Sequence, residues 1–112
     1  MGTFSVGSVV LVPFPFTDLS ATKLRPAIIV ASAGRGDWIC AQITSRPYSD
    51  SSAIEINNED FQFGSLNRSS YVKPSKLFTA NQSIFKRSVG KVNQKKLHEV
   101  HASIMEMFKN NE

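Results

Sequence analysis

Prolines and glycines divide this chain into short apolar runs, and this division limits what the chain can fold into. Residues 9–12 form a valine-rich apolar run, and Pro13 and Pro15 follow it closely. Because proline lacks a backbone donor, this strand must end there or lie at the edge of a sheet. Residues 26–31 form a second apolar run without interruption, which is typical of a strand covered on both faces.

A turn and an alternating strand follow. Residues 32–37 read SAGRGD, and their two glycines predict a hairpin between the second and third strands. In the next run, DWICAQITS, alternation places two sets of side chains on opposite faces. The expected core set is Ile39, Ala41 and Ile43, and the opposite set is Trp38, Cys40, Gln42 and Thr44. We expect Trp38 to be covered either by a second subunit or by the C-terminal helix.

The rest of the chain predicts further short strands and one helix. Residues 53–57 and 61–63 alternate, residues 69–78 form a strand broken or bent at Pro74, and residues 83–92 fit either a strand or a helical turn. Asn93 can cap a C-terminal helix. An apolar stripe at helical spacing then predicts the face that packs on the sheet: Leu97, Val100, His101, Ile104, Met105 and Phe108.

These elements predict a mainly β fold with a C-terminal α-helix. Five to seven short strands joined by turns in a chain of 112 residues favour a small β-barrel or half-barrel. This length corresponds to one domain, residues 1–112, with a small but real core.

The charge of the chain is uneven. The net charge is +4, and residues 73–96 carry seven cations and no acid. Such a basic segment suits a polyanionic partner, but it is equally typical of a solvated surface that serves solubility. No apolar run approaches the length of a membrane span, and no signal peptide is recognised. A single cysteine excludes an internal disulfide and fits a reducing compartment, so we expect a cytoplasmic protein.

No metal or cofactor site is expected. The only histidines, His98 and His101, lie three residues apart in the predicted helix, and Cys40 is far from both in the sequence. His101 falls in the apolar stripe, which predicts a packed histidine with one satisfied nitrogen. Cys40 is expected to be a small buried side chain. No phosphate-binding glycine loop or nucleophile elbow is present.

Arg25 is the candidate for a functional side chain that binds a phosphate. It lies where a loop meets the second strand, and Pro26 favours an extended conformation for it. Its guanidinium is always charged and matches phosphate oxygens. A hairpin around the glycine turn would pair Ala27 near Ile43 and Arg25 near Ser45, so that Arg25 approaches Thr44. From spacing alone, an arginine that caps the barrel end through backbone carbonyls, beside an ordinary strand threonine, is an equally good interpretation.

The ordered set GSVVLVPFPF, RPAIIV, QITS, SYVKPSKL and GKV before a C-terminal helix resembles the PemK/MazF family of toxins. The resemblance implies an SH3-like β-barrel that forms a homodimer and cleaves single-stranded RNA at specific sequences without a metal. It also implies an antitoxin protein that covers the RNA site with a flexible acidic segment. By position, Arg25 matches the catalytic arginine of the family, and Thr44, with Ser45 beside it, matches the strand-end hydroxyl.

The same resemblance implies the RNA contacts and the reaction. The contacts would come from Phe14, Phe16, Lys23, Gln42 and Lys73. A ribose 2′-hydroxyl would attack the adjacent phosphorus and leave a 2′,3′-cyclic phosphate. Arg25 would stabilise the phosphoryl charge and Thr44 would position the phosphate. No general base for the 2′-hydroxyl is identified.

The chain also departs from the family. Some members have an acidic residue shortly after the position of Lys73, where this chain has Pro74, Ser75 and Lys76, and some have an N-terminal histidine, which this chain lacks. A non-catalytic nucleic-acid-binding barrel is therefore an alternative. A gyrase inhibitor of the related CcdB type is another, although such toxins carry a tryptophan at the helix end and the only tryptophan here is Trp38.

Overall fold

The computed structural model describes residues 4–15, 22–47 and 50–111, except for the side chains of Pro15 and Thr22. Within these ranges the chain forms seven strands, two 3-10 turns and one helix. The strands are β1 (Ser8–Pro15), β2 (Thr22–Gly34), β3 (Asp37–Thr44), β4 (Ile54–Ile56), β5 (Phe61–Gly64), β6 (Ser70–Asn81) and β7 (Arg87–Val92). The turns are η1 (Asn58–Asp60) and η2 (Gln82–Ile84), and the helix is α1 (Gln94–Lys109).

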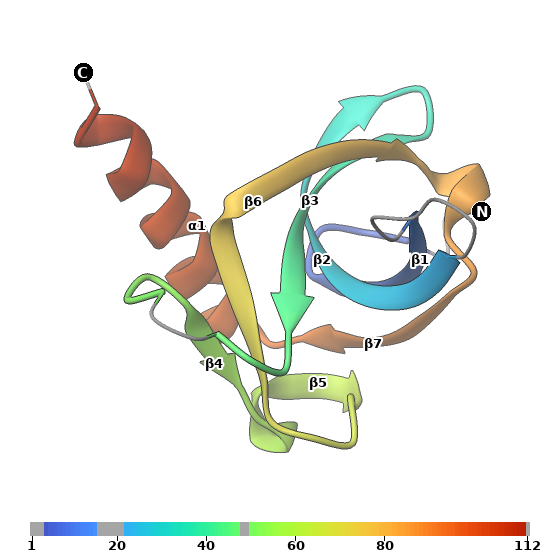
Figure 1. Cartoon of the computed structure of the whole chain (residues 1–112), viewed down its shortest axis with the longest axis horizontal. Helices are drawn as coiled ribbons and strands as arrows, with labels where there is room; N and C mark the ends of the chain where they lie inside the picture. The colour runs from blue at the N-terminus through green and yellow to red at the C-terminus, as the bar shows by residue number, and fades with distance from the viewer. Residues whose placement is uncertain (1–3, 16–21, 48–49, 112) are drawn as a thin grey trace.

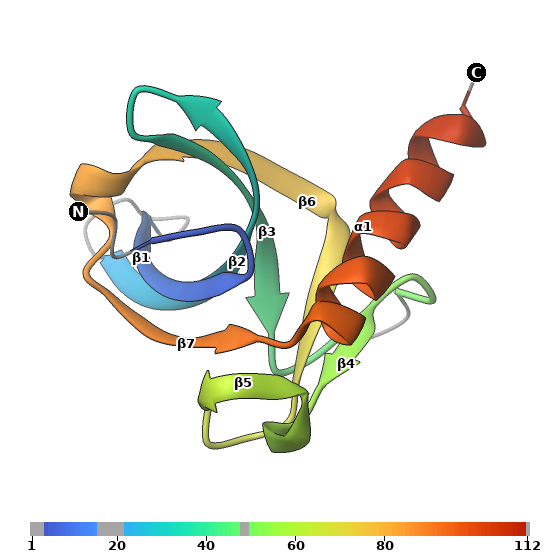
Figure 2. The ribbon, with the colours of Figure 1, turned by 180° about the vertical axis from the view of Figure 1, so that it is seen from behind.

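All seven strands belong to one antiparallel sheet in the order β4-β6-β3-β2-β1-β7-β5. The sheet curls around β1 and β2, and α1 lies outside it, beside β6 (Figure 1). The view from behind shows β4 and β5 together at one end of the curl (Figure 2). The predicted class, a mainly β half-barrel with a C-terminal helix, is confirmed.

The first strand is longer than its apolar run. β1 continues through Pro13 and Pro15, and all of its residues from Val9 onward pair with β2. Its pairing with β7 ends at Leu11. Within the described ranges, the prolines therefore lie where β1 has β2 on one side and no strand on the other, so the edge position is the correct alternative.

The sheet buries side chains on both of its faces. One cluster includes Ile28, Val30 and Ala41 and packs with the helix residues Leu97 and Val100. A second cluster lies on the other face and includes Ala27, Ile29 and Cys40. Neighbouring residues of β2 enter different clusters, so this strand is covered on both faces. This confirms the prediction made from its uninterrupted apolar run. The list of β3 core residues was incomplete, since fully buried Cys40 joins Ala41 and Ile43 in the interior.

The hairpin of β2 and β3 has a register that differs by one residue from our prediction. Ala27 pairs with Gln42 and not with Ile43. Two bulges near the turn, between Ile29 and Ala31 and between Ser32 and Gly34, produce this shift. The glycine turn itself is confirmed, with Gly34 and Gly36 in the left-handed region.

β6 is bent at Pro74 and not broken. Its register against β3 moves from Ala41–Leu77 to Gln42–Lys73, so residues 74–76 have no partner there. Pro74 is fully buried at this bulge. The corner in β6 is visible beside α1 (Figure 1). Residues 83–92, which fitted strand or turn, contain the end of η2 and then β7.

The helix is capped as predicted, since the Asn93 side chain accepts a hydrogen bond from the backbone of Lys96 at 2.8 Å. His101 is half-buried with its Nε2 at 2.8 Å from the Val30 carbonyl, which confirms a packed histidine with one satisfied nitrogen. The end of the stripe was predicted wrongly, since Met105 and Phe108 are 64% and 62% exposed. The last turns of α1 extend past the sheet (Figure 2). Trp38 packs against the second cluster, on the face opposite α1, so the helix does not cover it.

Candidate functional site

A pocket of about 310 Å³ lies at the ends of β2 and β3, and we call it the Arg25 pocket. Its lining residues are Leu11, Lys23, Leu24, Arg25, Pro26, Ile43, Thr44, Ser45, Leu66, Arg68 and Ser70. Three of them are cations, three carry hydroxyl groups and none is an acid. This combination offers charge and hydrogen-bond donors to an anion.

The strand register explains why Arg25 and Thr44 line one pocket. Ala27 pairs with Gln42, and the same register continued by two residues places Arg25 opposite Thr44. In an antiparallel pair, opposed residues point to the same face. The bulges that shift the register therefore bring Thr44, and not Ser45, opposite the arginine. Ser45 still lines the pocket from the end of β3.

The hydroxyl of Thr44 is oriented by a local turn. It donates to the Arg46 carbonyl at 3.2 Å and accepts from the Arg46 backbone N–H at 3.1 Å. This side-chain turn ends β3 and holds the oxygen at the pocket wall.

Of the expected RNA-contacting residues that the structure describes, only Lys23 lines the Arg25 pocket. Gln42 and Lys73 are paired across β3 and β6, and Gln42 lies two residues from Thr44 on the same face of β3. Lys73 forms an ion pair with Asp50, with 3.9 Å between Nζ and Oδ2. The structure thus brings Lys73 near the site, but with an acid beside it.

Phe14, one of the two phenylalanines expected to contact RNA, packs against the core. Phe14 is half-buried, and its ring meets that of Phe78 edge-on at a centroid distance of 5.2 Å. It packs at the edge of the second core cluster. Phe16 lies outside the described residues.

Arg68 and Ser70 belong to the pocket, although sequence reasoning missed them. Arg68 comes from the segment between β5 and β6, and Ser70 is the first residue of β6, so both lie more than twenty residues after β3 in the sequence. The only local signal was that Arg68 is the single cation of a segment otherwise acidic. No spacing rule connects such a turn to Arg25, because the contact depends on how the sheet closes.

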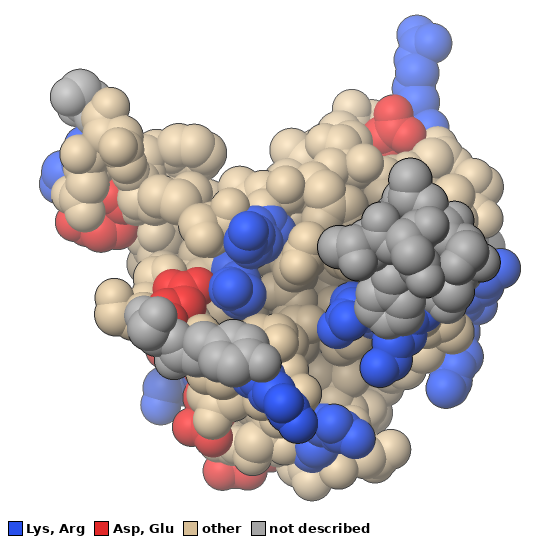
Figure 3. Space-filling view, in the orientation of Figure 1, with Lys and Arg blue, Asp and Glu red and all other residues tan. Residues whose placement is uncertain are grey.

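Outside the pocket, the surroundings of Asp50 and the distribution of surface charge bear on the site. The hydroxyl and backbone N–H of Ser52 hold the pKa of Asp50 below its usual range, and Lys73 and Lys76 add a smaller effect. On the face shown in Figure 3, Lys and Arg atoms lie on both sides of a central hollow, while most Asp and Glu atoms lie toward the helix side and the lower edge.

Three further observations concern residues outside the pocket. Burial raises the pKa of the Cys40 thiol to about 12, and the side chain is fully buried, as predicted. Among the described residues, no three His, Cys, Asp or Glu side chains come together in a way that would hold a metal ion. No helix in the described part of the chain is long and apolar enough to cross a membrane.

The sequence as a whole matches one family model, that of PemK-like, MazF-like toxins of type II toxin-antitoxin systems, over residues 5–108. The chain belongs to this family. The resemblance noted from the sequence motifs is thereby confirmed. No curated protein matches this PemK/MazF-family chain by sequence.

Solved structures of other toxins share the fold of this family member. MazE-MazF from Deinococcus radiodurans matches with a TM-score of 0.76 at 15% identity, over 96% of this chain and 98% of that one. An endoribonuclease in complex with its cognate antitoxin from a Mycobacterial species gives 0.71 at 13% identity, over 92% of both chains. Mycobacterium tuberculosis toxin MazF-mt6 gives 0.65 at 16% identity, over 89% and 96%. The TM-scores establish that these structures and this chain share a fold.

Proposed function

We propose that this family member is a single toxin domain, residues 1–112, that cleaves single-stranded RNA at specific sequences without a metal. The observation that carries the proposal is the Arg25 pocket. It combines Arg25, Thr44 and Ser45 with two further cations, and none of its described lining residues is acidic. The structural relatives described as endoribonucleases support the same reaction class.

The proposed reaction is an internal transfer at phosphorus. The ribose 2′-oxygen forms a bond to phosphorus and the bond from phosphorus to the 5′-oxygen breaks, which leaves a 2′,3′-cyclic phosphate and a 5′-hydroxyl. Negative charge builds up on the phosphoryl oxygens, and the Arg25 guanidinium stabilises it. Thr44 and Ser45 hold the phosphate through their hydroxyl groups.

Proton transfer is the weak part of this site. Among the residues that the structure describes, no histidine or carboxylate lines the Arg25 pocket. An arginine is a poor general base, because its pKa exceeds about 12. The 2′-hydroxyl therefore has no strong base among these residues, and we expect slow turnover.

Residues around the pocket extend the proposed RNA contact. Lys23 lines the pocket and is exposed, so it can bind a phosphate. Gln42 and Lys73 are paired on the sheet, two residues along β3 from Thr44 of the pocket. Phe14 and Phe16 complete the proposed set, with the Phe14 ring available for stacking only at its unpacked side.

The proposed partners follow from the family. Related structures contain MazE with MazF, or an endoribonuclease with its cognate antitoxin. We propose an antitoxin here whose acidic segment covers the cations of the Arg25 pocket. We also propose a cytoplasmic homodimer, for which exposed Met105 and Phe108 give support, because monomers rarely leave large apolar patches open. Sedimentation velocity would test it, with an expected mass of about twice the 12.4 kDa of one chain.

A second candidate function is RNA binding without cleavage. The described lining of the pocket, which holds no histidine or carboxylate, favours it. Binding that weakens with salt, together with intact RNA after long incubation, would establish this alternative.

The test of the main proposal is an RNA cleavage assay in EDTA. Wild-type protein and the Arg25→Ala, Thr44→Ala and Lys95→Ala variants are incubated with a long RNA, and the product ends are mapped. We expect cyclic-phosphate ends at one short motif. Arg25→Ala should slow cleavage by about 10²–10³-fold, because it removes a transition-state donor.

The control variant removes an exposed cation from α1, away from the pocket, and should cleave like wild type. Circular dichroism establishes that each variant is folded. Unchanged cleavage by folded Arg25→Ala would refute the assignment of Arg25, and absence of cleavage by the folded wild type would refute the enzyme.

A further inference from the structure

A second concavity, of about 390 Å³, lies next to the Arg25 pocket, and we call it the amide pocket. Its lining residues are Asn57, Asn58, Glu59, Asn67, Arg68 and Ser69. Its volume falls in the range of about 300–1,000 Å³ typical of sites for small ligands. Every lining side chain is polar, with three amides, a carboxylate, a guanidinium and a hydroxyl. Such a surface suits a ligand that carries several donors and acceptors.

The two pockets share one residue. Arg68 lines both the Arg25 pocket and the amide pocket. It is exposed, and within the described part of the chain its guanidinium forms no ion pair. A nucleic-acid strand that crosses from one pocket to the other would therefore pass a cation suited to a phosphate.

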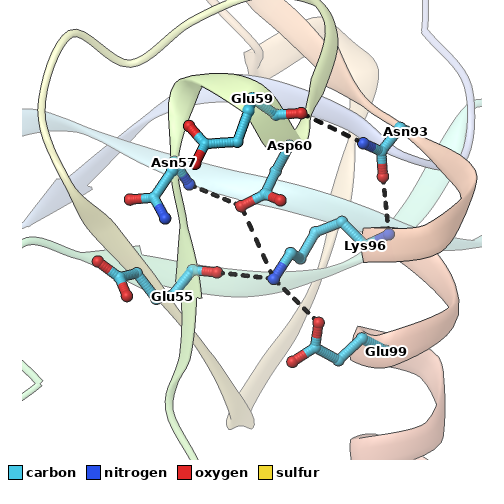
Figure 4. Close-up of polar contacts among 7 residues, drawn as sticks. All are labelled: Glu55, Asn57, Glu59, Asp60, Asn93, Lys96 and Glu99. Carbon is cyan, nitrogen blue, oxygen red and sulfur yellow. Dashed lines mark hydrogen bonds and ion pairs between the residues drawn. The ribbon is translucent and has the colours of Figure 1, made fainter.

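One wall of the amide pocket is held by the helix. Lys96 of α1 reaches the Glu55 carbonyl at 3.0 Å, the Asp60 carboxylate at 3.7 Å and the Glu99 carboxylate at 2.9 Å (Figure 4). Asp60 in turn accepts from the Asn57 backbone N–H at 2.8 Å. These contacts fix η1 against α1.

The functional groups of this wall remain available. In Figure 4 the amide of Asn57 and the carboxylate of Glu59 point away from Lys96. Among the described residues, the amide of Asn58 makes no hydrogen bond, and both Asn58 and Glu59 are exposed. The wall therefore combines a fixed backbone with side chains that are open to a ligand.

The opposite wall is a tight turn. Asn67 has a left-handed backbone, with φ of 65°, and its side-chain oxygen accepts a hydrogen bond from the Ser65 hydroxyl at 3.1 Å. Asparagine tolerates this conformation better than most residues. The turn presents Asn67, Arg68 and Ser69 toward η1.

We propose that the amide pocket binds one unpaired base of the RNA, at a nucleotide flanking the bond that is cleaved in the Arg25 pocket. Arg68 binds the phosphate between the two nucleotides. Single-stranded RNA is read through the edges of splayed bases, and amides and carboxylates match those edges. This inference rests on the proposed ribonuclease function and assigns part of its sequence specificity.

The chemistry of the pocket also selects the base. The carboxylate of Glu59 only accepts hydrogen bonds, so it favours a base that carries an amino group. Adenine, cytosine and guanine each have one, whereas uracil presents two carbonyls around a single N–H. We therefore expect discrimination against uracil at this one position.

The experiment maps the cleavage motif on a library of short RNAs with one randomised region. The Glu59→Gln and Asn58→Ala variants are compared with wild type and with Glu106→Gln, which removes the same charge from an exposed site on α1. We expect wild type and Glu106→Gln to discriminate against uracil at one flanking position. Glu59→Gln should lose that discrimination by about 5- to 150-fold, as for one base contact, with preferences elsewhere unchanged.

Each outcome decides a separate question. Cleavage by wild type with the same motif in Glu59→Gln and Asn58→Ala would overturn the base pocket and leave the ribonuclease intact. Loss of preference at every position at once would also overturn it, because the effect would then not be local. No cleavage by folded wild type would overturn the ribonuclease itself, and the base pocket with it.

Discussion

At the scale of single residues, the surroundings of each side chain decide whether it can react. Arg25 and Cys40 both lie in long strands of the sheet. Arg25 lies near the start of β2 and lines a pocket. Cys40 lies in the middle of β3 and is enclosed by the second core cluster. The guanidinium is therefore placed at an open pocket, whereas the thiol is enclosed among apolar side chains and donates a long hydrogen bond to the Trp38 carbonyl at 3.9 Å.

The thiol of Cys40 provides a prediction on reactivity and pH. Burial raises its pKa from 9.0 to about 12, so the folded state keeps the proton that the unfolded state loses above pH 9. The free energy of unfolding should therefore contain a contribution that is complete below pH 9 and declines as the pH rises toward 12. Urea titrations between pH 8 and 11 should show a shallower decline for Cys40→Ala than for wild type.

Iodoacetamide provides the control for that prediction. At pH 8 the thiol should be alkylated only in urea, at the rate of an ordinary cysteine once the chain unfolds. Rapid alkylation of the native protein would contradict the burial of Cys40.

At the scale of elements, two backbone features close the sheet. The bulge at Pro74 lets β6 turn a corner between its contacts with β3. At the other end, Gly64 lies so close to β7 that an added Cβ would clash with the Val89 carbonyl oxygen. Its φ of 81° is also in the left-handed region. β5 can therefore pair with β7 only because this residue is glycine.

Gly64→Ala should destabilise the protein by about 2–5 kcal/mol, because it combines left-handed strain with a steric clash. Gly34→Ala is the matched control, since Gly34 has a φ of 89° but nothing within 4 Å of an added Cβ. It should cost only about 1–2 kcal/mol. Urea unfolding midpoints measure both, and equal losses would show that the clash with β7 is relieved at no cost.

At the scale of the whole molecule, the distribution of charge should govern RNA affinity. The chain carries a net charge of +4, and the Arg25 pocket and the amide pocket together contain Lys23, Arg25 and Arg68. Each phosphate neutralised on a single strand changes the slope of log K against log salt by about −0.7. The slope therefore counts the phosphates that the protein contacts.

Binding of an RNA with a 2′-deoxy nucleotide at the cleavage position should show this dependence. We expect Lys23→Ala and Arg68→Ala each to reduce the magnitude of the slope by about 0.7. Lys109→Ala, at the end of α1, should leave it unchanged. Fluorescence anisotropy over a series of salt concentrations measures the slope, and equal slopes for all variants would remove Lys23 and Arg68 from the phosphate path.

Local pattern predicted much of this molecule. The apolar run of β2, the glycine turn, the Asn93 cap and the bend at Pro74 each depend on residues adjacent in sequence, and all were predicted. The ordered motifs also identified the family. The presence of Arg25 and Thr44 at the ends of neighbouring strands followed from the hairpin, because two strands joined by a short turn must lie side by side.

Tertiary structure alone decided the rest. The bulges of β2 set which residue faces Arg25, and a bulge has no reliable sequence signal when its cause is the curl of the sheet. Arg68 reached the site through the closure of distant strands, and Met105 and Phe108 were left exposed because the sheet ends before the helix does. The sequence by itself determined the elements and the charged residue at the start of a core strand. Only the folded sheet decided which distant side chains surround that residue, because contacts between segments far apart in the chain depend on how the whole sheet curls.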